Sequence, residues 1–134
     1  MTTKVINPVK DLCGRTDLQN SEFHGDFSES NFSYTNLTGS RFIDADLTDA
    51  NFEGSIMRGV EFYSSSLINV NFLSADLENV IMKPDCAIEN IDLTKAKIVG
   101  IQILPSNAII QDRTSLIAEK LGVDFVSRYV SEST

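Results

Sequence analysis

Residues 45–54 read Ala-Asp-Leu-Thr-Asp-Ala-Asn-Phe-Glu-Gly, which is one five-residue unit written twice. The third residue of the unit is large and apolar, and the residue two places before it is small. We call these two sites the large position and the small position. The large position recurs over twelve consecutive units, at Phe27, Phe32, Leu37, Phe42, Leu47, Phe52, Met57, Phe62, Leu67, Phe72, Leu77 and Met82. The small position before each of them is Gly, Ser, Thr, Ala or Val.

A period of five is incompatible with a continuous helix and with a flat strand. Five residues advance a helix by about 500°, which spreads the large positions around its whole circumference. In a strand, residues an odd number of places apart point to opposite faces, so successive large positions would alternate between core and solvent. The pattern closes only if the chain turns after each short extended piece, with the large and small positions pointing inward. The sequence therefore predicts a solenoid with a corner every five residues.

Three blocks carry a resemblance to a known family. Residues 45–49, 50–54 and 75–79 follow the pattern A(D/N)LXX, and over roughly residues 16–103 the chain resembles the pentapeptide-repeat proteins. The resemblance implies an all-β solenoid, a right-handed quadrilateral β-helix with four repeats in each coil. Position n then stacks on position n+20, so the large positions should form four columns.

Two irregularities interrupt this rhythm. Only four residues separate Phe23 from Phe27, which predicts a bulge or a tightened corner at His24-Gly25. After Met82 the frame slips by one residue, and the large positions resume at Ile88. Both breaks should appear as local shifts in the stacking register.

Both ends of a solenoid need a cover, because the terminal coils otherwise expose apolar columns and unpaired strand edges. We divide this single domain into an N-terminal cap (1–15), a β-helix (16–104) and a C-terminal segment (105–134). Within the last segment, Asp112 to Leu121 is predicted to form a short α-helix that stops at Gly122. The simplest role of this segment is to cap the final coil.

A second interpretation of the C-terminal segment comes from residues 115–123, Ser-Leu-Ile-Ala-Glu-Lys-Leu-Gly-Val. They resemble the C-terminal end of the Qnr-type quinolone-resistance proteins, a subgroup of the pentapeptide-repeat family in which this segment joins two solenoids end to end. The resemblance implies a homodimer with Leu116, Ile117 and Leu121 in its interface. The sequence leaves cap and dimer open.

Composition limits the possible functions of the chain. The 134 residues suit one compact domain, and no apolar run approaches the ~18 residues of a membrane span. The N-terminus lacks the apolar core of a signal peptide, so a cytoplasmic location is expected and both Cys13 and Cys86 should be free thiols. With His24 as its single histidine, the sequence offers no metal, nucleotide or nucleophile constellation. We therefore expect neither a cofactor nor enzyme activity.

Acidic residues dominate the predicted solenoid. Eleven acids and two bases fall between Thr16 and Met82, a net charge of −9 in a chain whose total is −8. Stacking by twenty pairs Asp26 with Asp46 and Glu29 with Asp49. Like charges ~5 Å apart repel by roughly 0.8 kcal/mol in water before screening, so stability alone does not favour such ladders. The simplest explanation is that Asp suits tight corners and that negative charge keeps the protein soluble.

The family resemblance implies a sharper role for this charge. Qnr-type proteins are thought to imitate duplex DNA and to occupy the DNA-binding saddle of DNA gyrase or topoisomerase IV. In this chain the contact field would comprise Asp26, Glu29, Asp44, Asp46, Asp49 and Glu53. The same negative field disfavours direct binding to nucleic acid. A structural or adaptor solenoid that binds another protein, with no role at gyrase, remains the alternative.

Overall fold

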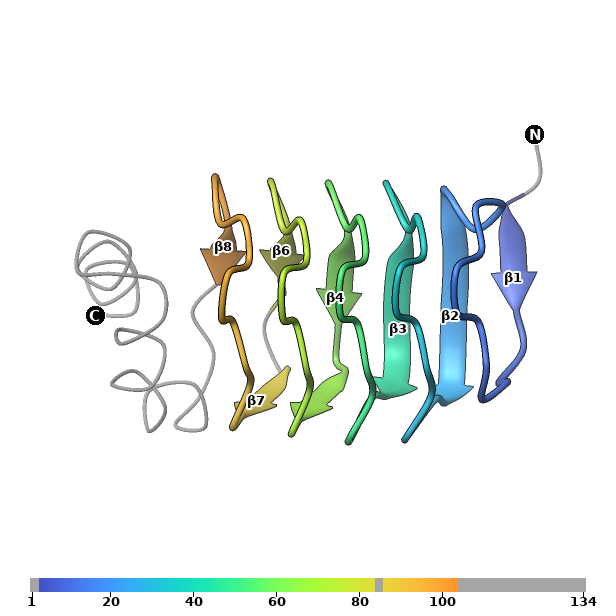
Figure 1. The fold of residues 1–134 in the computed structure, drawn as a ribbon. Coiled ribbons are helices and arrows are strands. Elements are labelled where there is room, and N and C mark those ends of the chain that lie inside the picture. The colour runs from blue at the N-terminus through green and yellow to red at the C-terminus, as the bar shows by residue number, and fades with distance from the viewer. Residues whose placement is uncertain (1–2, 84–85, 104–134) are drawn as a thin grey trace.

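The computed structural model describes residues 3–83 and 86–103, and shows a parallel β-solenoid of about four turns (Figure 1). All the strand pairs are parallel. Six strands pair in sequence along one side: β1 (Lys4–Ile6), β2 (Ser21–Asp26), β3 (Arg41–Asp46), β4 (Glu61–Tyr63), β6 (Ile81–Met82) and β8 (Gln102–Ile103). On the next side, β5 (Ser66–Ile68) pairs with the end of β3 and with β7 (Ala87–Glu89). The predicted solenoid is confirmed.

The stacking register is the predicted one, including its two shifts. Arg41 lies opposite Glu61, a separation of twenty residues. Before the break between His24 and Gly25 the separation is nineteen, with Glu22 opposite Arg41, so the predicted bulge is present. Beyond residue 83 it becomes twenty-one, with Ser66 opposite Ala87. The frame slip is therefore confirmed by the strand pairing.

Stacked large positions make the core. Every large position from Phe27 to Met82 is buried, and four columns run along the solenoid axis. Phe32, Phe52 and Phe72 form one stack, with ring centroids 4.6 and 5.4 Å apart. Phe42 meets Phe32 and Phe52 edge to face at 5.7 Å, so two Phe columns interlock across the core. Such aromatic pairs add to the free energy gained by burial alone.

The corners share one backbone conformation. Every described residue two places after a large position, from Leu12 to Ile98, has a positive φ, and we call this site the corner position. Seventeen described residues occupy it: Gly14, Asn20, Gly25, Glu29, Tyr34, Gly39, Asp44, Asp49, Gly54, Gly59, Ser64, Asn69, Ser74, Asn79, Asn90, Lys95 and Gly100. Pro84 occupies this position in the sequence after Met82, and the proline ring cannot adopt a positive φ. This gives a physical reason for the frame slip that follows Met82.

Asp or Asn directly before a large position closes the turn that leads to the corner. Its Oδ1 atom accepts a hydrogen bond of 2.9–3.2 Å from the backbone N–H two residues later. This Asx turn recurs at Asp11, Asp26, Asn31, Asn36, Asp46, Asn51, Asn71, Asp76 and Asp92. The side-chain amides of Asn71 and Asn51 also bond along the axis at 3.3 Å. The Asp or Asn of the A(D/N)LXX pattern thus follows from local hydrogen bonding.

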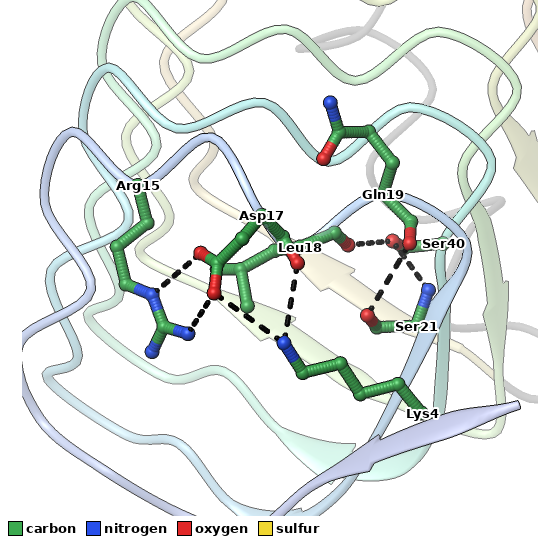
Figure 2. Close-up of polar contacts among 7 residues, drawn as sticks. All are labelled: Lys4, Arg15, Asp17, Leu18, Gln19, Ser21 and Ser40. Carbon is green, nitrogen blue, oxygen red and sulfur yellow. Dashed lines mark hydrogen bonds and ion pairs between the residues drawn. The ribbon is translucent and has the colours of Figure 1, made fainter.

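The N-terminal segment is built into the first coil. Ile6 pairs with Phe23, and the N–H of Leu12 donates to the carbonyl of Asn31 at 2.8 Å. Figure 2 shows how ion pairs hold β1: Lys4 Nζ lies 3.4 Å from the carboxylate of Asp17, which Arg15 also contacts at 2.6 Å. The segment that we expected to cap the solenoid therefore adds its own strand to the sheet.

The predicted C-terminal cap or dimerisation segment, 105–134, lies outside the described residues. The same holds for the predicted helix and for Leu116, Ile117 and Leu121. Their roles stay predictions.

Candidate protein-binding surface

Five of the six predicted contact acids lie on or beside one side of the solenoid, which we call the acidic side. Asp26 and Asp46 are directly opposite each other in the pairing of β2 with β3. Glu29 and Asp49 follow them at the next corner, and Asp44 occupies the preceding corner of β3. The sixth acid, Glu53, belongs to the adjacent side, beyond the corner at Asp49. The first two full coils therefore carry a short ladder of acids along one edge.

The acidic side has few internal counter-ions. The nearest base is Lys10, whose Nζ lies 4.0 Å from Asp26. Among residues 3–83 and 86–103, no Lys, Arg or His comes within 4.0 Å of the carboxylates of Glu29, Asp44, Asp46, Asp49 or Glu53. Among the described residues, no ion pair neutralises their charge.

Several acids on other sides of the solenoid are internally paired, whereas Glu53 and Asp11 have no described base within 4.0 Å. Arg58 bonds Asp76 at 2.6 Å and lies 3.8 Å from Glu78, which Lys97 also contacts at 3.2 Å. Glu22 and Glu61 face bases as well, Arg41 at 3.4 Å and Lys83 at 3.9 Å respectively. Asp76, Glu78, Glu22 and Glu61 are thus neutralised by neighbouring bases, whereas Glu29, Asp44, Asp46 and Asp49 of the acidic side face no described base within 4.0 Å.

Backbone geometry explains the residue types on the acidic side but not their charge. Asp26 and Asp46 form Asx turns, while Asp49 takes a positive φ of 62°. Asn serves both roles elsewhere in the solenoid, as Asn51 and Asn69 do, without adding charge. Hydrogen bonds from the hydroxyl and then the backbone N–H of Ser28 lower the pKa of Asp26, which keeps this carboxylate ionised. The backbone roles of these residues therefore do not explain why they are Asp rather than Asn.

One exposed side chain near this surface escaped the sequence analysis. Tyr34 occupies a corner position with a φ of 57° and is 60% exposed. Its hydroxyl donates to Glu53 Oε2 at 2.8 Å, and its ring fills the space that a Cβ on Gly54 would need. The hydrogen bond to Glu53, followed by the charge of this carboxylate, raises the pKa of Tyr34. The sequence contained a signal for this contact: Tyr34 is a bulky residue at a corner, and the residue twenty places later, which stacks on it, is Gly54.

Other kinds of site find no support in the described part of the chain. It contains no group of three or more His, Cys, Asp or Glu side chains placed to hold a metal ion. The described residues include no helix that is long and apolar enough to cross a membrane. Cys13 is exposed and Cys86 is buried, and the structure forms no disulfide between them.

Comparison with known proteins finds a family match for part of this solenoid. The model of the family described as pentapeptide repeats matches eight copies, over residues 26–62 and 45–83. Residues 26–83 of the described solenoid therefore match the pentapeptide-repeat family. The sequence matches no curated protein.

Several solved pentapeptide-repeat structures are similar. Rfr23 from the cyanobacterium Cyanothece 51142 has a TM-score of 0.53 and 22% identity, over 72% of this chain and 60% of that one. A thylakoid-lumen protein of Arabidopsis thaliana has a TM-score of 0.41 and 18% identity, over 85% of this chain and 76% of that one. QnrB1, a plasmid-mediated fluoroquinolone-resistance protein, has a TM-score of 0.38 and 15% identity, over 78% of this chain and 72% of that one. The similarity to Rfr23 concerns the fold alone, and the chain spans only 60% of Rfr23.

Proposed function

We propose that this pentapeptide-repeat protein is a binding module whose acidic side imitates duplex DNA and docks in a basic groove of a type II topoisomerase. The observation that carries the proposal is that Asp26 stacks on Asp46 and Glu29 stacks on Asp49. Of these four acids, only Asp26 has a basic side chain within 4.0 Å among the described residues. A rigid anionic rod is steered to a basic groove by its field and is released by salt, as DNA is. Binding, rather than catalysis, is the activity that this surface supports.

DNA gyrase or topoisomerase IV is the partner that the Qnr-type resemblance implies. Residues 115–123 carry that resemblance, and a homodimer through Leu116, Ile117 and Leu121 would double the length of the anionic rod. Binding of this kind would modulate the enzyme, or protect it from quinolones or from gyrase-directed toxins. The proposed site of action is the cytoplasm.

The test is a DNA supercoiling assay with purified gyrase, with and without ciprofloxacin. We expect excess protein either to inhibit supercoiling or to relieve inhibition by the drug. The variant Asp46→Asn/Asp49→Asn should require a several-fold higher concentration, because it removes two exposed charges while keeping both backbone roles. Asp76→Asn/Glu78→Gln is the matched control, since it removes two charges that are internally paired, and it should behave as the wild type does.

A wild-type protein that neither inhibits gyrase nor relieves the drug would rule out the topoisomerase partner. The alternative is an adaptor solenoid that binds a different basic protein through the same side. A pull-down from cell lysate separates the two, because recovery of gyrase subunits that moderate salt releases would count against the adaptor.

A further inference from the structure

The solenoid contains one example of a tyrosine and a glutamate that hold a cation together. The hydroxyl of Tyr63 donates to Glu61 Oε1 at 2.6 Å. Lys83 Nζ lies 5.4 Å from the centroid of the Tyr63 ring and 3.9 Å from Glu61 Oε1. An aromatic face and a carboxylate both attract an ammonium or guanidinium group, so their effects combine at one point. This internal site shows which ligand such a pair accepts.

Tyr34 and Glu53 repeat this chemistry on the side next to the acidic side. Their hydroxyl–carboxylate hydrogen bond is 2.8 Å long. In residues 3–83 and 86–103, no cationic side chain lies over the Tyr34 ring or within 4.0 Å of Glu53. Glu53 follows Asp49 by four residues and directly precedes the next corner, Gly54, so the pair lies at the far end of the side that adjoins the acidic side. The Tyr63–Glu61 pair therefore holds a cationic side chain, whereas the Tyr34–Glu53 pair holds none among the described residues.

The Tyr34 ring is held in place before any partner arrives. A Cβ on Gly54 would lie 2.4 Å from Cε1 of Tyr34, so only glycine at this position lets the ring rest against the next coil. The hydrogen bond to Glu53 fixes the other end of the side chain. A preorganised aromatic group loses little conformational entropy when it binds. Its exposure of 60% leaves surface for contact.

We propose that Tyr34 and Glu53 form a receptor for a lysine or arginine side chain of the protein partner. The cation would pack on the exposed ring surface and form an ion pair with the carboxylate, as Lys83 does at Tyr63 and Glu61. The inference rests on the proposed function insofar as the partner presents a basic surface. It adds a specific contact and its chemistry to a surface otherwise defined by charge alone.

Isothermal titration of the full chain with octa-arginine and octa-lysine peptides at low salt tests the receptor. Tyr34→Asn removes the ring, leaves the net charge unchanged and suits the positive φ. Ser74→Asn is the matched control, because Ser74 occupies the same kind of corner two coils further on and also has a positive φ. We expect Tyr34→Asn to bind about two- to fivefold more weakly, which equals the ~0.5–1 kcal/mol of an exposed cation–π contact. Ser74→Asn should bind as the wild type does.

Nuclear magnetic resonance of the tyrosine rings supplies a second readout. Adding either peptide should shift the Tyr34 ring signals and leave those of Tyr63, which already faces Lys83, in place. Absence of peptide binding, equal binding by Tyr34→Asn, or shifts confined to Tyr63 would each overturn the receptor. If peptide binding depends on Tyr34 but the protein has no effect on gyrase, the topoisomerase partner fails and the receptor stands.

Discussion

At the scale of single residues, the corner position is the most demanding site in the repeat. Twelve of its seventeen described occupants are Gly, Asn or Asp, the residues that tolerate a positive φ best. The exceptions are Glu29, Tyr34, Ser64, Ser74 and Lys95. Tyr34 has a candidate function that accounts for its presence, whereas the exposed Ser74 makes no side-chain hydrogen bond to the described residues. Ser74 is therefore a place where strain can be relieved without loss.

Ser74→Gly is expected to stabilise the protein by about 0.5–1 kcal/mol. The left-handed conformation costs an ordinary residue about 1–2 kcal/mol, and the greater freedom of glycine in the unfolded chain offsets part of that gain. Urea denaturation followed by circular dichroism measures the difference. Ser66→Gly is the matched control: Ser66 lies within β5 and has no positive φ, so the same substitution should destabilise there. Destabilisation by both variants would contradict the strain at the corner.

At the scale of the repeat elements, ion pairs between coils supplement the backbone ladder. Arg58 reaches from one coil to Asp76 in the next, 2.6 Å away, and the side chain of Asp76 is only 17% exposed. Burial raises the pKa of Asp76, but hydrogen bonds from Arg58 and the N–H of Glu78, with the charges of Arg58 and Lys97, outweigh it and leave the pKa below its ordinary value. A carboxylate with a lowered folded-state pKa stabilises the fold above its unfolded pKa. That stability is lost as the pH falls through the folded value.

Acid should therefore weaken the wild type partly through Asp76. From neutral pH to below ~4, the urea midpoint is expected to fall, and Asp76→Asn should show a smaller fall. At neutral pH the variant should be less stable by up to about 1 kcal/mol, because Asn keeps the Asx turn but loses the ion pair. A variant whose pH profile parallels that of the wild type would show that this pair contributes nothing.

Much of this element-scale architecture was predictable from periodicity alone. The columns, the bulge at His24-Gly25 and the slip after Met82 all follow from counting in fives, because the register admits few alternatives. The pairing of Arg58 with Asp76 did not follow, since long side chains at adjacent outward positions can reach several partners. Tyr34 was missed for a similar reason: its contact with Gly54 depends on side-chain direction at a corner, which the repeat pattern does not report.

At the scale of the whole molecule, charge is distributed in a way that folding does not require. Acids that face Arg58, Lys83 and Lys97 are neutralised, whereas those of the acidic side stack on one another. Stacked strands are ~4.8 Å apart, so these carboxylates repel along the axis. A surface selected for stability would carry Asn here, as Asn51 does at the Asx turn of the next side and Asn69 does at the corner in the next coil. The acidic side thus opposes the stability that the core supplies.

This conflict gives opposite expectations for the fold and for the partner. Asp46→Asn/Asp49→Asn should stabilise the protein by roughly 1 kcal/mol at low salt, since it removes one member of each stacked pair. The gain should shrink in high salt, where screening already relieves the repulsion in the wild type. Denaturation with urea, which adds no ions, measures it at both salt concentrations, with Asp76→Asn/Glu78→Gln as the control that should lose stability instead. If the acidic-side variant were less stable at low salt, its acids would be serving the fold, and the case for a surface kept for a basic partner would lose its physical basis.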